Sequence, residues 1–239
     1  AKYRPGNSTR NRCYLCQDAT LLGDPQNHWA GNHNPHLAAM IESIDDGVGL
    51  ILNKLKSLKL DQNTIVIFTS DNGGETKVTS NAPLRGGKSQ LYEGGIRVPL
   101  IVSWPDTIPS AGVSLQPTSN VDFYPTLIKA ANIPANIHHT IDGISLLNTW
   151  KQSKSLSKRR ALFWHYPLEK PHFLGGISSG AIRYGDWKLI ERFNDNSIEL
   201  YNLTKDPSET VNLAEKNPAL KKVMLNQLIE WRKSFGATK

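Results

Sequence analysis

Residues 36–69 contain the pattern that most restricts how this chain can fold. Apolar residues recur every three or four positions from 36 to 59, which predicts an amphipathic helix, and Asn34-Pro35 supplies its start signal. A short polar turn separates this helix from 64–69, a continuous and β-branched apolar run. Such a run is typical of a buried parallel strand. Helix, turn and strand in this order form the second half of a βαβ unit, so the sequence predicts an α/β fold.

The pattern changes at the basic, serine-rich stretch 151–160, which is the best candidate for a domain boundary. Before it, 98–104 predicts a second apolar strand and 122–132 a short helix. After it, four short strand candidates separated by hairpin turn signals predict a small antiparallel sheet: 161–166, 180–183, 187–192 and 198–201. An amphipathic segment after Asn217-Pro218 predicts a closing helix. We therefore expect two domains, 1–155, in which 1–35 is loop-rich, and 156–239.

Composition excludes several classes of protein. Two cysteines in 239 residues cannot form a disulfide framework, and no apolar stretch approaches the roughly 20 residues of a membrane span. The first 20 residues hold no apolar signal-peptide core. The net charge of +7 favours an anionic partner. Because the basic residues are scattered and lack interleaved aromatic residues, we expect no nucleic-acid partner.

Asp71 and Asn72 directly follow the predicted strand 64–69, and ligands gather at the carboxyl ends of strands in open α/β sheets. A carboxylate beside an amide oxygen offers two hard oxygen ligands, which suit Ca²⁺ or Mg²⁺. An Asx-type turn that simply ends the strand explains the same residues. Two ligands also do not complete a calcium site, which takes about six to eight oxygens. Spacing alone therefore leaves a metal site and a turn both open.

The segment 83–97 places four glycines and three basic residues within fifteen positions. Lys88 is flanked by glycines that allow close approach to an oxyanion, and a flexible ammonium is a good point-charge partner for sulfate or phosphate. The spacing does not match a phosphate-binding P-loop. A glycine-rich surface loop with solvated charges is the alternative, so the segment indicates an anion site only in general terms.

Three consecutive segments resemble signatures of the type I sulfatases, which belong to the alkaline-phosphatase-like superfamily: FTSDNGG (68–74), PLRGGK (83–88) and YEGGIRVP (92–99). The resemblance continues in order and without large gaps from about 36 to 230, through 38–49, 120–127, 162–167, 181–190, 199–203 and 206–214. Each segment is a weak signal by itself, but the ordered set is highly specific.

The resemblance implies a fold, a reaction and a site. The fold is part of an alkaline-phosphatase-like, mostly parallel sheet flanked by helices, with a small C-terminal antiparallel sheet and a closing helix. The reaction is hydrolysis of a sulfate ester by a formylglycine nucleophile, with a calcium ion (Mg²⁺ is possible) acting as a Lewis acid. By position, Asp71 and Asn72 correspond to two metal ligands, and Lys88 to the catalytic lysine that contacts the sulfate. In similar sulfatases the start of the strand that carries His165 borders the substrate cleft, which makes His165 a candidate substrate-binding residue; a partly buried structural histidine is the alternative.

The chain also departs from the family pattern. The Cys/Ser-x-Pro-x-Arg motif that yields formylglycine is absent, and Cys13 and Cys16 are followed by Gln17-Asp18. The first strand, whose paired aspartates complete the metal site, is absent too. The chain therefore resembles the carboxyl-terminal half of a sulfatase, which by itself is expected to be inactive and to expose apolar sheet. Its expected partners are the missing N-terminal half and a sulfated small molecule or sulfated glycan.

Two other functions remain alternatives. One is a phosphodiesterase or phosphonate hydrolase of the same superfamily, and the other is a non-catalytic module that binds sulfated glycans. The family resemblance implies a periplasmic or extracellular location.

A few further residues have two interpretations each. Cys13, Cys16, His28 and His33 approach zinc-finger spacing, but a variable loop or a Cys13–Cys16 disulfide fits them as well. His172 lies in the loop 168–178, a candidate for substrate specificity. Arg85 and Arg97 are expected to orient the loop around Lys88 by pairing with carboxylates.

Overall fold

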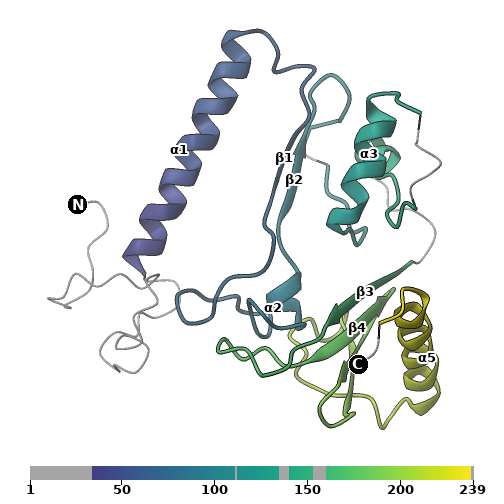
Figure 1. Ribbon diagram of the computed structural model, residues 1–239. Coiled ribbons are helices and arrows are strands. Elements are labelled where there is room, and N and C mark those ends of the chain that lie inside the picture. Colours follow the sequence, from purple (N-terminus) through teal and green to yellow (C-terminus); the bar gives the residue numbers. More distant parts are fainter. Residues whose placement is uncertain (1–33, 111, 135–139, 153–159, 238–239) are drawn as a thin grey trace, which may run out of the picture. The chain divides into compact units, whose positions relative to one another are not determined.

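The computed structural model describes residues 34–110, 112–134, 140–152 and 160–237 (Figure 1). These residues form two compact units. The first consists of 34–51, Ser70–Pro99 and 163–237, and the second of Leu52–Thr69 with the described part of Leu100–Leu162. The domain boundary predicted after residue 155 lies outside the described residues. The same holds for the predicted loop 1–35, apart from its last two positions, and for the candidate zinc or disulfide residues within it.

Helix α1 (Pro35–Ser57) confirms the first predicted helix. The Oδ1 atom of Asn34 accepts a hydrogen bond from the backbone N–H of Leu37 at 3.2 Å, so Asn34 satisfies one of the N–H groups at the start of the helix. Two lysines in the last turn complement the helix dipole. Much of the apolar stripe is exposed, for example Met40, Ile41, Ile44, Ile51 and Leu52. None of the described helices is long and apolar enough to cross a membrane.

Strands β1 (Val66–Thr69) and β2 (Leu100–Ser103) confirm the two predicted apolar strands but correct their direction. They pair antiparallel, with Val66 opposite Ser103, so the parallel strand expected at 64–69 is wrong for this pair. An apolar run reports how hydrophobic a strand is, but carries no information about the direction of its neighbour. Phe68 is 45% and Ile101 61% exposed, so this sheet does expose apolar side chains, as expected.

The second unit also contains the 3₁₀ turn η2 (Asn120–Asp122) and helices α3 (Phe123–Ala130) and α4 (Leu147–Gln152). Asp122 is fully buried and forms a bidentate ion pair with Arg160, with N–O distances of 2.7 and 2.9 Å. Its Oδ1 atom also accepts the backbone N–H of Ile144 at 2.9 Å. These donors satisfy both oxygens of the buried carboxylate, and removing one partner from such a buried pair is strongly destabilising. Helix α4 was not predicted, because its six residues are too few to show a period.

The C-terminal sheet is antiparallel in its resolved pairings, as predicted, and has the strand order β3-β4-β5-β6. Its strands are β3 (Ala161–Tyr166), β4 (Ser179–Tyr184), β5 (Trp187–Arg192) and β6 (Ile198–Asn202). Helix α5 (Pro218–Ser234), the predicted closing helix, packs on β4 and β5 (Figure 1). Trp231 of α5 stacks on Phe163 of β3, with ring centroids 4.8 Å apart.

Candidate functional site

Asp71 and Asn72 lie two and three residues beyond β1, at the start of a glycine-rich loop. Asp71 is exposed, and its Oδ1 atom accepts the backbone N–H of Asn72 at 3.0 Å, an Asx-type contact. The exposed carboxylate and the neighbouring amide are hard oxygen donors that fit Ca²⁺ or Mg²⁺. No cluster of three His, Cys, Asp or Glu that could hold a metal occurs among the described residues. The donor chemistry of the pair fits a metal ion, but the described residues do not complete a site, so the metal role of Asp71 and Asn72 stays a prediction.

The loop that carries Lys88 is bound to this first loop through the backbone. The N–H of Lys88 donates to the carbonyl of Gly74 at 3.1 Å, and the N–H of Gly73 donates to the carbonyl of Gly95 at 2.9 Å. The Asn81 side chain reinforces the junction, because its Nδ2 donates to Gly74 at 2.7 Å while its Oδ1 accepts from Gly74 at 2.9 Å. The structure thus brings the two segments together and leaves the Lys88 side chain exposed.

The backbones approach so closely at Gly87 that no side chain fits. A Cβ atom there would lie 2.7 Å from Nδ2 of Asn81 and in collision with the carbonyl oxygen of Gly74. We expect Gly87→Ala to displace Lys88 and to speed amide hydrogen exchange about tenfold or more in a peptide covering 85–97. The matched control is Gly49→Ala in α1, where a Cβ meets nothing within 4 Å. If neither variant changes exchange in this peptide, the packing at Gly87 does not position Lys88.

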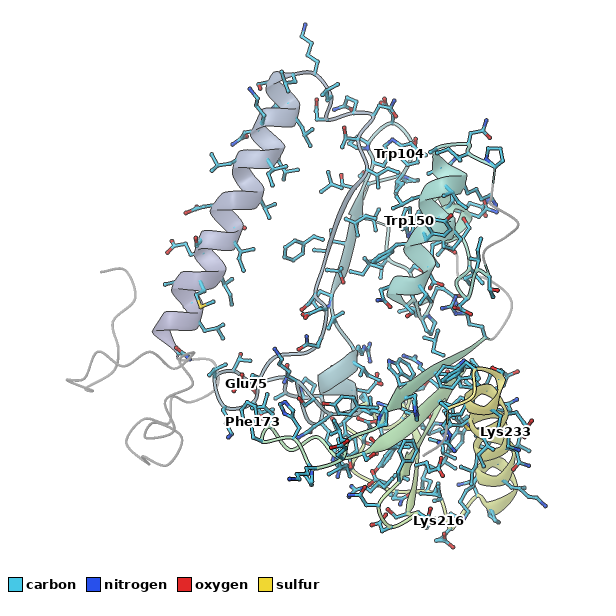
Figure 2. The ribbon with its side chains drawn as sticks, in the orientation of Figure 1. Glu75, Trp104, Trp150, Phe173, Lys216 and Lys233 are labelled. Carbon is cyan, nitrogen blue, oxygen red and sulfur yellow. The ribbon has the colours of Figure 1, made fainter. Side chains whose placement is uncertain are left out.

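The predicted specificity loop, 168–178, borders the Lys88 loop. The Nδ1 atom of His172 lies 3.0 Å from Oγ of Ser89, and Gln90 donates a hydrogen bond to the carbonyl of Leu174 at 3.1 Å. Phe173, labelled in Figure 2, is 64% exposed, and the Lys77 ammonium lies 5.4 Å from its ring centroid. His172 thus lies next to the immediate neighbour of Lys88, which agrees with a place at the edge of the site.

His165 on β3 has a different environment. Its ring packs on Phe193 and Phe235, at centroid distances of 5.5 and 6.2 Å. Burial and the Arg232 charge lower the pKa of His165, so its neutral form is favoured. These contacts support the structural alternative, and no described contact joins His165 to Asp71 or Lys88. A substrate-binding role for His165 stays a prediction.

Two family models match the chain. The model described as Sulfatase matches residues 6–133, and the model described as N-sulphoglucosamine sulphohydrolase, C-terminal, matches residues 87–234. The first match alone covers more than half of the chain. The chain belongs to the sulfatase family.

Relatives and solved structures agree with this sulfatase assignment. The chain is 37% identical over 216 residues to a sulfatase of Formosa agariphila, covering 81% of this chain and 39% of that protein. It is 31% identical over 220 residues to an N-acetylgalactosamine-6-O-sulfatase of Bacteroides thetaiotaomicron, covering 80% and 40%. The sulfatase chain therefore spans about two-fifths of the length of these curated relatives.

Solved structures confirm the expected alkaline-phosphatase-like α/β fold. Ps i-CgsB in complex with k-i-k-neocarrahexaose has a TM-score of 0.74 at 30% identity, covering 83% of this chain and 43% of that chain. A structure in complex with its substrate D-glucosamine-2-N,6-O-disulfate has a TM-score of 0.67 at 30% identity, covering 81% and 39%. A phosphonate monoester hydrolase from Silicibacter pomeroyi, at 20% identity and a TM-score of 0.63, shares the fold.

In this member of the sulfatase family, side chains from the C-terminal sheet contact the Lys88 loop. Arg85 donates to the Tyr201 hydroxyl at 3.0 Å and lies 3.9 Å from the Glu199 carboxylate. Arg97 lies 3.8 Å from Glu93. Both arginines thus pair with carboxylates, as expected.

Glu199 is the acceptor at the centre of one such group. Burial raises the pKa of Glu199, but hydrogen bonds from the Tyr201 and Tyr92 hydroxyls and the Arg192 guanidinium outweigh it. The pKa of Glu199 therefore lies below its ordinary value, because these donors stabilise the charged form. The sequence did not predict this network, since its members are far apart in the chain. In the sequence Glu199 looks like an ordinary exposed residue of a strand.

The lowered pKa of Glu199 predicts acid sensitivity. A depressed carboxylate pKa stabilises the fold above the unfolded-state pKa of about 4.3, and this contribution is lost as pH falls through the folded-state value. We expect Glu199→Gln to be less stable than wild type at pH 7 and the difference to shrink below about pH 4. Urea denaturation of wild type and Glu199→Gln, from pH 7 to below about pH 4, measures this difference in the free energy of unfolding. A stability difference that does not change with pH would contradict a lowered pKa of Glu199 in the folded protein.

Proposed function

We propose that this chain contributes Asp71, Asn72 and Lys88 to the active site of a sulfatase that hydrolyses sulfate esters of carbohydrates. The observation that carries the proposal is the backbone junction at Gly73 and Gly74. It connects the two oxygen donors to the loop of the exposed lysine within a chain of the sulfatase family. A cation and a lysine placed together suit a dianion-like transition state, in which negative charge increases on the sulfate oxygens.

The reaction cleaves the S–O bond of the ester. In the net reaction one water supplies an oxygen to the sulfur and two protons, one of which goes to the departing alcohol and the other to solvent, which gives sulfate and a free hydroxyl group. Lys88 holds the sulfate through its ammonium group and stabilises charge on its oxygens. Asp71 and Asn72 would hold a Ca²⁺ (or Mg²⁺) ion, which would supply Lewis-acid polarisation of the sulfate when bound.

The nucleophile comes from residues outside these 239. No Cys/Ser-x-Pro-x-Arg motif occurs in the sequence, so the formylglycine that the family uses has no source here. In this proposal, the upstream half of the same enzyme provides it together with the remaining metal ligands. The chain alone is then inactive, and export to the periplasm or the cell exterior is part of the proposal.

The substrate class rests on the relatives. Solved structures with similar folds hold a neocarrahexaose and a glucosamine disulfate, and one curated relative is an N-acetylgalactosamine-6-O-sulfatase. The net charge of +7 agrees with an anionic, sulfated glycan.

The test is hydrolysis by the complete protein that contains this chain, after mass spectrometry confirms formylglycine. We expect release of sulfate from 4-nitrophenyl sulfate and from a 6-sulfated hexosamine, and loss of activity when a chelator removes the metal. Faster hydrolysis of the matching phosphate or phosphonate esters would instead favour the phosphonate hydrolase alternative. Retention on heparin without any turnover would favour a non-catalytic glycan-binding module.

A further inference from the structure

A buried cluster of charges connects the C-terminal sheet to the site loops. Lys188 of β5 is completely buried, and its Nζ atom lies 3.0 Å from Oε1 of Glu93 and 2.9 Å from Oε1 of Glu209. The two carboxylates are also buried, at 1% and 0% exposed. Oε2 of Glu209 in addition accepts the backbone N–H of Glu93 at 2.6 Å. A buried ammonium between two buried carboxylates is costly to form and tolerates little displacement.

Glu93 begins the short helix α2 (Glu93–Ile96), and the glycines that follow it contact both site loops. The N–H of Gly94 donates to the carbonyl of Arg85 at 2.7 Å, three residues before Lys88. The carbonyl of Gly95 accepts the N–H of Gly73 at 2.9 Å, one residue after Asn72. A Cβ at Gly94 would lie 2.5 Å from the Arg85 carbonyl oxygen, so the backbone of this turn packs directly against the Lys88 loop. Hydrogen bonds and close packing thus connect the turn that Glu93 begins to both loops.

We propose that Lys188, Glu93 and Glu209 are positioning residues, which align Lys88 with the Asp71-Asn72 pair through the α2 turn. The consequence for catalysis rests on the role proposed above for Lys88. The cluster itself contacts no substrate and acts only through the backbone of the two loops.

A double-mutant cycle in the complete protein tests this coupling. We expect Glu93→Gln, which keeps the side-chain volume, to lower kcat/KM for 4-nitrophenyl sulfate by about tenfold or more in the wild type. In a Lys88→Ala background the same substitution should change kcat/KM by less than about threefold, because the group it positions is gone. Equal losses in both backgrounds would overturn the inference.

The control is another buried ion pair of similar exposure. Arg232 of α5 lies 2.8 Å from Glu191 of β5, at 5% and 2% side-chain exposure. Arg232→Met also leaves a buried carboxylate, and any loss it causes should be the same with and without Lys88. The inference would be overturned if the loss in kcat/KM caused by Arg232→Met depended on Lys88 as strongly as the loss caused by Glu93→Gln. General destabilisation would then explain both results.

Amide hydrogen exchange provides a readout that needs no turnover. We expect Glu93→Gln and Lys188→Met to speed exchange about tenfold or more in peptides covering 70–76 and 85–97, and Arg232→Met to leave those peptides unchanged. Unchanged exchange in both loop peptides would overturn the inference. If the wild type hydrolyses no sulfate ester, the proposed function fails, while the exchange result still decides whether the cluster positions the loops.

Discussion

Replacing Lys188 by methionine is expected to lower the free energy of unfolding by about 3–5 kcal/mol, the cost of removing one partner from a buried ion pair. Methionine has a similar length, so packing changes little and the loss is electrostatic. Glu93 and Glu209 would remain buried at 2% and 0% side-chain exposure without their shared cation. Burial already raises the pKa of Glu209, an effect that the Lys188 charge opposes.

Urea denaturation followed by tryptophan fluorescence measures this loss. The control is Lys233→Met in α5, since Lys233 is 66% exposed, lies on the side of the helix facing away from the sheet (Figure 2) and pairs with an exposed glutamate. Surface pairs of this kind contribute at most about 1 kcal/mol. If Lys188→Met and Lys233→Met destabilise equally, the buried cluster does not stabilise the fold as described.

Replacing Lys88 by alanine in the complete protein that contains this chain is expected to lower kcat for sulfate esters by about 10²- to 10³-fold, the usual effect of losing one donor to a developing oxyanion. The backbone N–H of residue 88 would still donate to Gly74, so the loop should keep its conformation. Stability should therefore change little, because the lysine side chain is exposed.

Steady-state kinetics with 4-nitrophenyl sulfate and thermal unfolding of the same samples separate these two effects. Lys77→Ala is a matched control, because Lys77 is another exposed lysine of the same unit and lies beside Phe173. A Lys88→Ala enzyme with wild-type kcat would show that this lysine does not contact the reacting sulfate.

Local features were predictable because their signals lie within a few neighbouring residues. The helix at 36–59, the strands of the C-terminal sheet and the closing helix each carry their own period, and the structure confirms them within a few residues. Asp71, Asn72 and Lys88 were candidates for the same reason, since each stands in a short segment with glycines beside it.

Other features depend on which distant segment packs against a given segment, and the sequence did not predict them. The apolar run at 64–69 gave the strand but not its antiparallel pairing with 100–103, because direction is a property of two segments. Helix α2 was missed because its four residues include two glycines, which disfavour helix in the absence of tertiary contacts.

The sequence by itself determined the α/β class, the sulfatase family and three candidate site residues, because ordered motifs and local periodicity encode them. Only the tertiary structure decided how those residues are held. Lys188 and Glu93 are 95 residues apart, and Glu93 and Glu209 are 116 apart. In the sequence they look like ordinary charged residues of strands and loops. Their burial and pairing arise only when the C-terminal sheet packs on the site loops, and contacts over such separations leave no local pattern.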